Sequence, residues 1–214
     1  MMKNKSYIGV AFIILIFGIY AVPKIVDNFK KVELHTFSQV PNFEFIDQHN
    51  KTVTNQTYNG KVYVLEFFFT TCPTICPIMN KKMIEVQNEF FGNPNFGVAS
   101  VSINPDFDTP EVLNAYAKEY GVNSPNWHML TGKPKEVVYD LSNNGFKLFA
   151  GVAGEEVGGF EHSGLFALVD KNGYIRSRYD KDGNPIMYYR ALKENEFEDQ
   201  IKELKEDIKI LLNE

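Results

Sequence analysis

The sequence has 214 residues, of which 44% are hydrophobic and 14% aromatic, so it can bury one well-packed domain but not two large ones. The 27 acidic residues outnumber the 22 basic ones, the net charge is −5, and no run of Lys and Arg forms a phosphate-binding stripe. We therefore expect no nucleic-acid partner. Only two cysteines are present, and they lie close together, which excludes a multi-disulfide scaffold.

The N-terminal residues have the pattern of a membrane segment. Residues 1–6 carry two lysines and no acid, and residues 7–22 (YIGVAFIILIFGIYAV) form an unbroken apolar run. The run is slightly short for a span of about 20 residues, but residues 23–26 can extend it. A signal-anchor and a cleaved signal peptide both fit. Because no A-x-A-like cleavage site follows, we favour a cytoplasmic stub and transmembrane anchor over residues 1–26, in a bacterial plasma membrane with the remaining chain on its extracytoplasmic or periplasmic side.

The exported part is predicted to begin with a tether and a hairpin. Residues 27–40 are mixed and polar and predict a tether, so a single domain is expected over residues 41–214. Residues 43–45 and 52–54 alternate around a turn and predict an N-terminal hairpin. Residues 61–69 (KVYVLEFFF) are almost continuously β-branched or aromatic, which is typical of a strand buried on both faces at the centre of a sheet.

The remaining elements alternate between helix and strand. In chain order we expect a helix over 79–91, a strand over 96–103, a helix over 109–120, a strand over 127–130, a helix over 134–143, a hairpin of 165–169 with 174–179, and a terminal helix over 195–212. Thr109 and Pro110 suit the cap and first position of their helix. Apolar residues at spacings of three and four support the terminal helix. This order predicts an α/β fold.

The cysteines lie in a turn directly after the central strand, where open α/β sheets place their sites. In residues 70–77 (TTCPTICP), Pro77 is preset for a helix start, so the next helix should begin near it. Cys76 then lies at the positive end of the helix dipole, which favours a thiolate there. A thiolate serves both disulfide exchange and soft-metal binding. Because Cys72 and Cys76 are four positions apart, they can form a disulfide or hold one ion.

Two thiolates rarely saturate a metal, so a third ligand is expected, and the sequence offers four histidines. His35 in the tether and His49 in the hairpin turn are interpreted as solvated loop residues. His128 alternates with apolar neighbours and is interpreted as a structural strand residue. His162, within residues 160–164 (FEHSG), stands at the start of a predicted strand and is the candidate ligand. A glycine-rich stretch that can move precedes it, with Gly151, Gly154, Gly158 and Gly159.

These segments resemble the Sco/SenC family, the copper-binding assembly factors of cytochrome c oxidase. The resemblance runs from about residue 41 to residue 212. Its most specific parts are residues 68–77, 102–120, 130–132 and 161–163. The family resemblance implies a thioredoxin-like α/β fold with an N-terminal hairpin and inserted segments, here preceded by the transmembrane helix.

The resemblance also implies a site and a role. Copper, as Cu(I) and optionally Cu(II), would be bound by Cys72, Cys76 and His162. The protein would deliver copper or reducing equivalents to the dinuclear copper site of an oxidase subunit, and it would need a copper donor that the resemblance does not identify. Thioredoxin-type oxidoreductases carry a cis-proline beside their redox cysteines, and here a histidine replaces it.

The sequence departs from the family pattern at two acids. Asn104 stands where family members usually have Asp, and Glu161 stands where they usually have Asp before the histidine. An acid next to a ligand can orient it, so metal affinity or selectivity is expected to change. Asp106 and Asp108 remain nearby, and either they serve the site or they only shape the turn into the following helix.

Two functions stay open, together with a purely structural interpretation. The first is a copper chaperone, and the second is a thiol-disulfide reductase in which Cys72 and Cys76 act on the cysteines of an apo-oxidase or another exported protein. A peroxidase is a distant third. A structural Cys72–Cys76 disulfide would give His162 no role. The absent cis-proline and the extra residue relative to C-x-x-C favour copper, so we do not expect a dedicated enzyme, although oxidoreductase activity can coexist.

Overall fold

The computed structural model of the protein describes residues 6–29, 33–154, 158–193 and 197–214. Contacts divide the chain into two units, Met1–Glu33 and Leu34–Glu214. The first unit holds helix α1 (Ser6–Phe29), whose large apolar side chains between Val10 and Val22 are exposed. Among the described residues, no helix is both long enough and apolar enough to cross a membrane. Of the predicted stub and anchor, residues 6–26 are helical and residues 1–5 lie outside the described ranges. The membrane role of this segment stays a prediction.

The second unit is built on a large mixed sheet. In chain order its strands are β1 (His35–Gln39), β2 (Glu44–Asp47), β3 (Thr52–Thr54), β4 (Val62–Phe68), β5 (Phe96–Ser102), β6 (Trp127–Thr131), β9 (Leu165–Val169), β10 (Tyr174–Ser177) and β11 (Tyr189–Arg190). Their spatial order is β1-β10-β9-β4-β5-β6-β2-β3, and β11 also pairs with β9. Strands β4, β5 and β6 are parallel, and the other pairs are antiparallel. As predicted, β4 lies at the centre and every one of its residues is buried.

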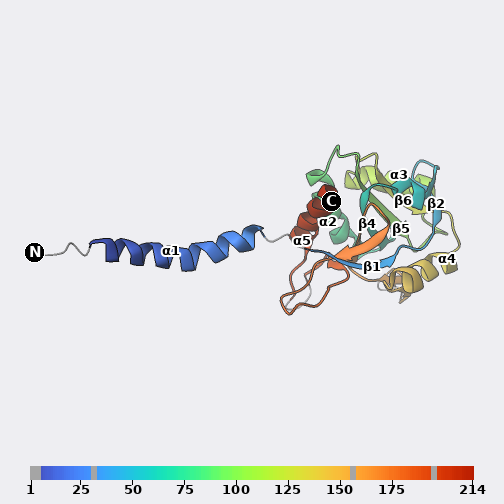
Figure 1. Ribbon diagram of the computed structural model, residues 1–214. Coiled ribbons are helices and arrows are strands. Elements are labelled where there is room, and N and C mark those ends of the chain that lie inside the picture. The colour runs from blue at the N-terminus through green and yellow to red at the C-terminus, as the bar shows by residue number, and fades with distance from the viewer. Residues whose placement is uncertain (1–5, 30–32, 155–157, 194–196) are drawn as a thin grey trace, which may run out of the picture. The chain divides into compact units, whose positions relative to one another are not determined.

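Helices cover both faces of this sheet. They are α2 (Cys76–Glu89), α3 (Pro110–Tyr120), α4 (Lys135–Asp140) and α5 (Ile201–Asn213), with a short 3-10 helix η1 (Asn55–Tyr58) and a π-helical segment η2 (Leu141–Phe146). Helix α2 packs against both α3 and α5 (Figure 1). Neighbouring side chains of β4 point to opposite faces, so the Phe68 ring meets Tyr116 of α3 while the Phe67 ring meets Phe146 of η2.

The predicted caps of α3 are confirmed. Thr109 is extended, and its side-chain oxygen accepts the backbone N–H of Val112. Pro110 occupies the first helical position, and Gly121 ends the helix in the left-handed region. This helix therefore starts and stops where its sequence signals lie, which fixes the loop that joins it to β5.

The predicted boundary between tether and domain is wrong. The tether expected over residues 27–40 fails in its second half, because His35–Gln39 forms β1 and pairs with β10. An edge strand needs only one apolar face, and here partly buried Phe37 packs against the core. The folded unit thus begins at Leu34. Residues 27–29 of that tether belong to α1, and residues 30–32 lie outside the described ranges.

The terminal helix starts at Ile201, later than the predicted residue 195. The Ile201 backbone N–H donates to the side chain of Asp199, and residues 198–200 before it have no regular secondary structure. Phe197 consequently lies ahead of the helix and is exposed. The predicted residues 195 and 196 lie outside the described ranges.

A second, two-stranded sheet was not predicted. It consists of β7 (Ala150–Val152) and β8 (Phe160–His162), paired antiparallel with His162 opposite Ala150. Gly158 and Gly159 both have positive φ in the connection between the strands. The glycine-rich stretch is therefore a β hairpin that ends on the candidate histidine.

Candidate metal centre

The turn from β4 to α2 brings the two cysteines together. The Cys72 backbone N–H donates to the carbonyl of Phe69, which closes a tight turn after the strand. Helix α2 then begins at Cys76, followed by Pro77, as the sequence predicted. The first N–H groups of a helix lack partners within it. Here the Cys76 N–H donates to the Sγ of Cys72 at 3.4 Å, so a sulfur serves as the acceptor at this helix start.

His162 reaches the cysteines from the β7–β8 hairpin. Its Nε2 lies 3.0 Å from the Sγ of Cys76. Its Nδ1 lies 3.1 Å from the backbone carbonyl of Ser163, an acceptor, so Nδ1 carries the proton in the neutral ring. The lone pair of Nε2 then faces the sulfur. This is the tautomer that a histidine needs in order to bind a metal through Nε2.

The three predicted site residues form one compact ligand set. The two sulfurs and one ring nitrogen of Cys72, Cys76 and His162 all lie within 4.8 Å of one another, and all three residues are buried. Both cysteines are free thiols. The two sulfurs are soft donors and the imidazole nitrogen is a borderline one, a set that suits Cu(I) or Zn²⁺ and does not suit Mg²⁺ or Ca²⁺.

The two sulfurs differ in their electrostatics. The hydrogen bond with the Cys76 side chain lowers the pKa of Cys72 well below its usual range, against the opposing effect of burial, and the His162 ring and the Cys76 backbone amide lower it further. Burial and the neighbouring Cys72 raise the pKa of Cys76. The prediction of the thiolate at Cys76 is therefore wrong. The helix-start amide points at Cys72, while Cys76 itself is only 1% exposed.

The site opens into a cleft of about 860 Å³. Its lining includes Cys72, Thr74, His162 and Arg190. The Phe69 ring packs edge-on against the His162 ring, 5.9 Å between centroids, and so forms a wall behind the ligand. A hollow of about 920 Å³ beside β2 and α4 is lined by neither cysteine nor histidine. The reactive chemistry thus belongs to the smaller cleft.

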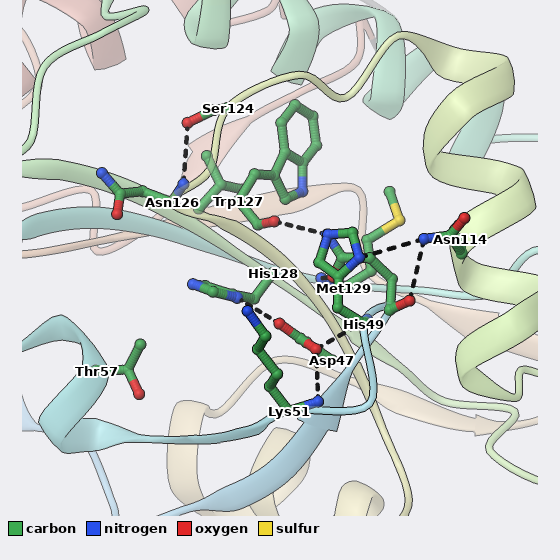
Figure 2. A network of polar contacts seen from close by, with 12 residues as sticks. Asp47, His49, Lys51, Thr57, Asn114, Ser124, Asn126, Trp127, His128 and Met129 are labelled. Carbon is green, nitrogen blue, oxygen red and sulfur yellow. Dashed lines mark hydrogen bonds and ion pairs between the residues drawn. The ribbon is translucent and has the colours of Figure 1, made fainter.

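His128 has the structural role that the sequence indicated (Figure 2). It lies on β6, and its Nδ1 contacts Oδ2 of buried Asp47 at 3.0 Å. The other oxygen of Asp47 accepts the backbone N–H groups of His49 and Lys51 and so fixes the β2–β3 turn. Burial lowers the pKa of His128. The cluster therefore ties the hairpin to the neighbouring strand.

The other two histidines also lie outside the ligand set. His49 is exposed in the turn, as predicted, and its ring contacts Asn114 of α3 (Figure 2). His35 is not a loop residue, because it lies on β1 and its Nδ1 is 2.9 Å from the hydroxyl of Tyr179.

The acids near the site differ in burial and in their contacts. Glu161 and Asp106 are exposed, and Asn104 is partly buried. Asp108 is fully buried and accepts hydrogen bonds from Thr70, two residues before Cys72. Asp108 therefore contacts the cysteine turn, and its role in the site stays a prediction.

Sequence reasoning missed a buried acid beneath the site. Glu66 on β4 is fully buried, and burial raises its pKa to about 7 although Ser100 donates a hydrogen bond to it. Among the described residues, its Oε2 has no hydrogen-bond partner. Its negative charge also acts to raise the pKa of Cys76. The signal was available, because a lone charge in an otherwise apolar central strand is unusual.

Comparison with known proteins places this site in a family. The family model described as SCO1/SenC matches residues 33–195. The chain is 30% identical over 144 residues to the SCO1 protein homolog of Bacillus subtilis, covering 66% of this chain and 74% of that protein. The crystal structure of a SCO1/SenC family lipoprotein from Bacillus anthracis matches with a TM-score of 0.70 and 26% identity, over 83% of this chain and 97% of that one.

A solved structure of Bradyrhizobium japonicum ScoI with copper bound shares the fold, with a TM-score of 0.62 and 22% identity, over 81% of this chain and 99% of that one. The predicted thioredoxin-like α/β architecture is confirmed by these neighbours.

Proposed function

Because this chain belongs to the SCO1/SenC family, we propose that it is a copper chaperone that binds the ion through Cys72, Cys76 and His162 and passes it to the copper-site subunit of a cytochrome c oxidase. One observation carries this proposal: two sulfurs and an imidazole nitrogen lie within 4.8 Å of one another beside an open cleft. The family resemblance selects copper from the soft metals that this donor set suits.

The three ligands have different roles in the binding of the ion. Cys72 lines the cleft and already favours the thiolate, so it is the first sulfur that an incoming Cu(I) ion meets. Cys76 is more deeply buried and must lose its proton before it binds the ion. His162 offers the unprotonated Nε2 from the other side. Three ligands leave room for a cysteine of the receiving protein to bind the ion and displace them one at a time.

A competition titration tests this function. Cu(I) is titrated into the reduced domain, residues 34–214, and into the full chain in detergent, each with a competing chelator. We expect one tightly bound ion per chain and a loss of at least tenfold in affinity for His162→Ala. His49→Ala, at an exposed histidine outside the ligand set, is the matched control. Unchanged affinity in His162→Ala would remove His162 from the site and favour the second function.

The second candidate is a thiol-disulfide reductase for an exported protein. The lowered pKa of Cys72 favours it, because a thiolate beside the cleft is the attacking group in disulfide exchange. Cys72 would attack the client disulfide, and Cys76 would then attack the mixed disulfide. The products are a reduced client and a Cys72–Cys76 disulfide. Rapid reduction of an oxidised oxidase subunit by the reduced protein, together with weak copper binding, would establish this function instead.

We also propose that residues 1–26 hold the protein at a bacterial plasma membrane, with the folded domain on the extracytoplasmic side. The apolar run 7–22 and the exposed apolar side chains of α1 support this placement. The copper-receiving subunit would then meet the domain on that side. Membrane fractionation, followed by protease treatment of intact cells or spheroplasts, tests both the attachment and the side. Release of the full-length chain in the soluble fraction would contradict the anchor.

A further inference from the structure

The turn that carries Cys72 is hydrogen-bonded to the loop between β5 and α3. Asp108, at the end of that loop, accepts the backbone N–H of Thr70 on Oδ2 at 3.2 Å and the hydroxyl of Thr70 on Oδ1. The hydroxyl of Ser102, the last residue of β5, donates to the same Oδ2 at 2.5 Å. Both oxygens of one carboxylate are thus engaged, and two of the three donors come from a single residue of the cysteine turn.

Burial makes the hydrogen bonds of Asp108 costly to break. Asp108 is 0% exposed, and its partners are neutral hydroxyl and amide groups, with no ion pair to it recorded in the described ranges. Burial raises its pKa, and the bonds from Ser102 and Thr70 oppose that rise. A buried carboxylate is costly unless it accepts hydrogen bonds, so the arrangement strongly resists displacement of any one donor.

The loop that carries Asp108 is itself hydrogen-bonded to the sheet, so the position of Asp108 is fixed. The Ile103 N–H donates to the carbonyl of Phe68 and extends the pairing of β5 with β4. The Asn104 N–H donates to the hydroxyl of Ser102, and the Asp108 N–H donates to the carbonyl of Asn104. Asp108 is therefore anchored to β5 and, through the bond of Ile103, to β4, the strand that precedes the cysteine turn.

A short chain of contacts leads from Asp108 to a metal ligand. Thr70 stands inside the tight turn closed by the hydrogen bond from Cys72 N–H to the Phe69 carbonyl. Cys72 in turn places its sulfur against the N–H of Cys76. A displacement of Thr70 must therefore move the sulfur of Cys72 relative to Cys76 and His162, whose ligand atoms lie within 4.8 Å.

We propose that Asp108 is a positioning residue of the metal centre, which acts through Thr70 to hold the Cys72 sulfur in the ligand set and against the first amide of α2. It does not bind the ion. Its role for copper depends on the proposed function, whereas its role in placing the Cys72 sulfur does not. Groups that support a metal ligand typically change metal affinity by 10- to 100-fold when they are altered.

The first test compares Asp108→Asn with Asp207→Asn. In Asp108→Asn, the new side-chain amide would present N–H donors where the carboxylate accepts, so at least one of the three bonds is lost. Asp207 is an equally buried aspartate, but it accepts from Arg178 and Tyr189 and does not contact the cysteine turn. At equal fraction folded, we expect Cu(I) affinity to fall about tenfold or more in Asp108→Asn and to stay within twofold in Asp207→Asn.

The second test removes only the hydrogen bond from the Thr70 hydroxyl to Asp108. It therefore still tests the proposal if Asp108→Asn fails to fold. Thr70→Val deletes the hydroxyl donor, and Thr70→Ser retains it. Each variant is measured twice: by Cu(I) competition and by the equilibrium of the Cys72–Cys76 disulfide and two glutathione thiols with the dithiol and glutathione disulfide. Loss of the amide contact removes stabilisation of the Cys72 thiolate, so the equilibrium should shift towards the protein disulfide.

A change greater than twofold in either measurement, present in Thr70→Val or Asp108→Asn and absent from Thr70→Ser and Asp207→Asn, supports the positioning role. Values within twofold of wild type for Asp108→Asn and Thr70→Val in both measurements overturn it. If the wild type binds no Cu(I), the proposed chaperone function fails, and the glutathione equilibrium alone decides the role of Asp108.

Discussion

The backbone N–H of Cys76 donates to the Sγ of Cys72 across 3.4 Å, so the positive end of α2 stabilises the sulfur of the other cysteine rather than its own. Cys72 also lines the cleft, whereas Cys76 is only 1% exposed. The two thiols are therefore unequal in both charge and access, although they are only four residues apart.

This inequality predicts selective alkylation of Cys72. Because its pKa is lowered, the thiolate persists at acidic pH, and its rate with iodoacetamide at pH 6 should stay within a few-fold of that at pH 8. An ordinary thiol loses about a hundredfold over the same two units. Peptide mass spectrometry of the reduced protein measures the rates, and Cys72→Ser should abolish the fast labelling. Equal labelling of Cys76 would contradict the assignment.

A methyl group at Gly158 should disturb the site. Gly158 has a φ of +89°, and a Cβ there would lie 3.0 Å from Pro73 Cδ and 3.1 Å from the Phe69 ring. The hairpin of His162 would have to move away from the cysteine turn, so Gly158→Ala should weaken Cu(I) binding several-fold.

Gly159→Ala is the matched control for that change. Its φ of +82° gives similar backbone strain, but a Cβ there meets no atom within 4 Å. It should lose about 1 kcal/mol of stability with little change in Cu(I) affinity. Equal affinity losses in both variants would show that strain, not the contact with the cysteine turn, governs binding.

Glu66 should make the fold less stable as the pH rises. Burial raises its pKa from 4.5 to about 7, so below about pH 4.5 both folded and unfolded chains hold the proton and no penalty arises. Between these values the unfolded chain releases the proton and the folded chain keeps it, and stability falls by roughly 3 kcal/mol in total. Urea denaturation at pH 5 and pH 8 measures this loss. Glu66→Gln should lack it, and parallel pH curves for the two proteins would refute the assignment.

Removal of His128 should cost stability and spare the metal. His128→Ala leaves Oδ2 of buried Asp47 without its ring partner, which should cost about 1 to 3 kcal/mol of unfolding free energy in urea. Cu(I) affinity at equal fraction folded should match wild type, because His128 is no part of the ligand set. A tenfold fall in affinity would instead place His128 at the metal.

The elements with strong local signals were predictable. The central strand β4 and the capped helix α3 follow from an apolar run and from Thr109 with Pro110, because buried strands and helix starts depend on nearby residues. The cysteine pair followed from its place after β4. The edge strand β1 did not, because a strand with one covered face needs few apolar residues, and its pairing partner β10 lies far along the chain.

The finer chemistry of the site was less accessible to sequence. Dipole reasoning placed the thiolate at Cys76, and this was wrong, because the first amide of α2 faces the sulfur of Cys72. Which sulfur it faces depends on the fold of the turn before the helix. The β7–β8 hairpin escaped because its strands have three residues each and glycines between them. Asp108 lies 38 residues from Thr70, a pairing that only the parallel β4–β5 arrangement reveals.

Because β7 and β8 form a separate sheet, the histidine ligand and the two cysteine ligands belong to different structural parts of the domain. The two sulfurs lie in the turn between β4 and α2, whereas the ring nitrogen of His162 lies on the β7–β8 hairpin. The two strands of that hairpin pair with each other, and the Ser163 N–H donates to the Phe149 carbonyl. Withdrawal of His162 breaks none of the strand pairing of the nine-stranded sheet. In the proposed chaperone, release of the ion through a local opening of this hairpin would not require the free energy that keeps the domain folded.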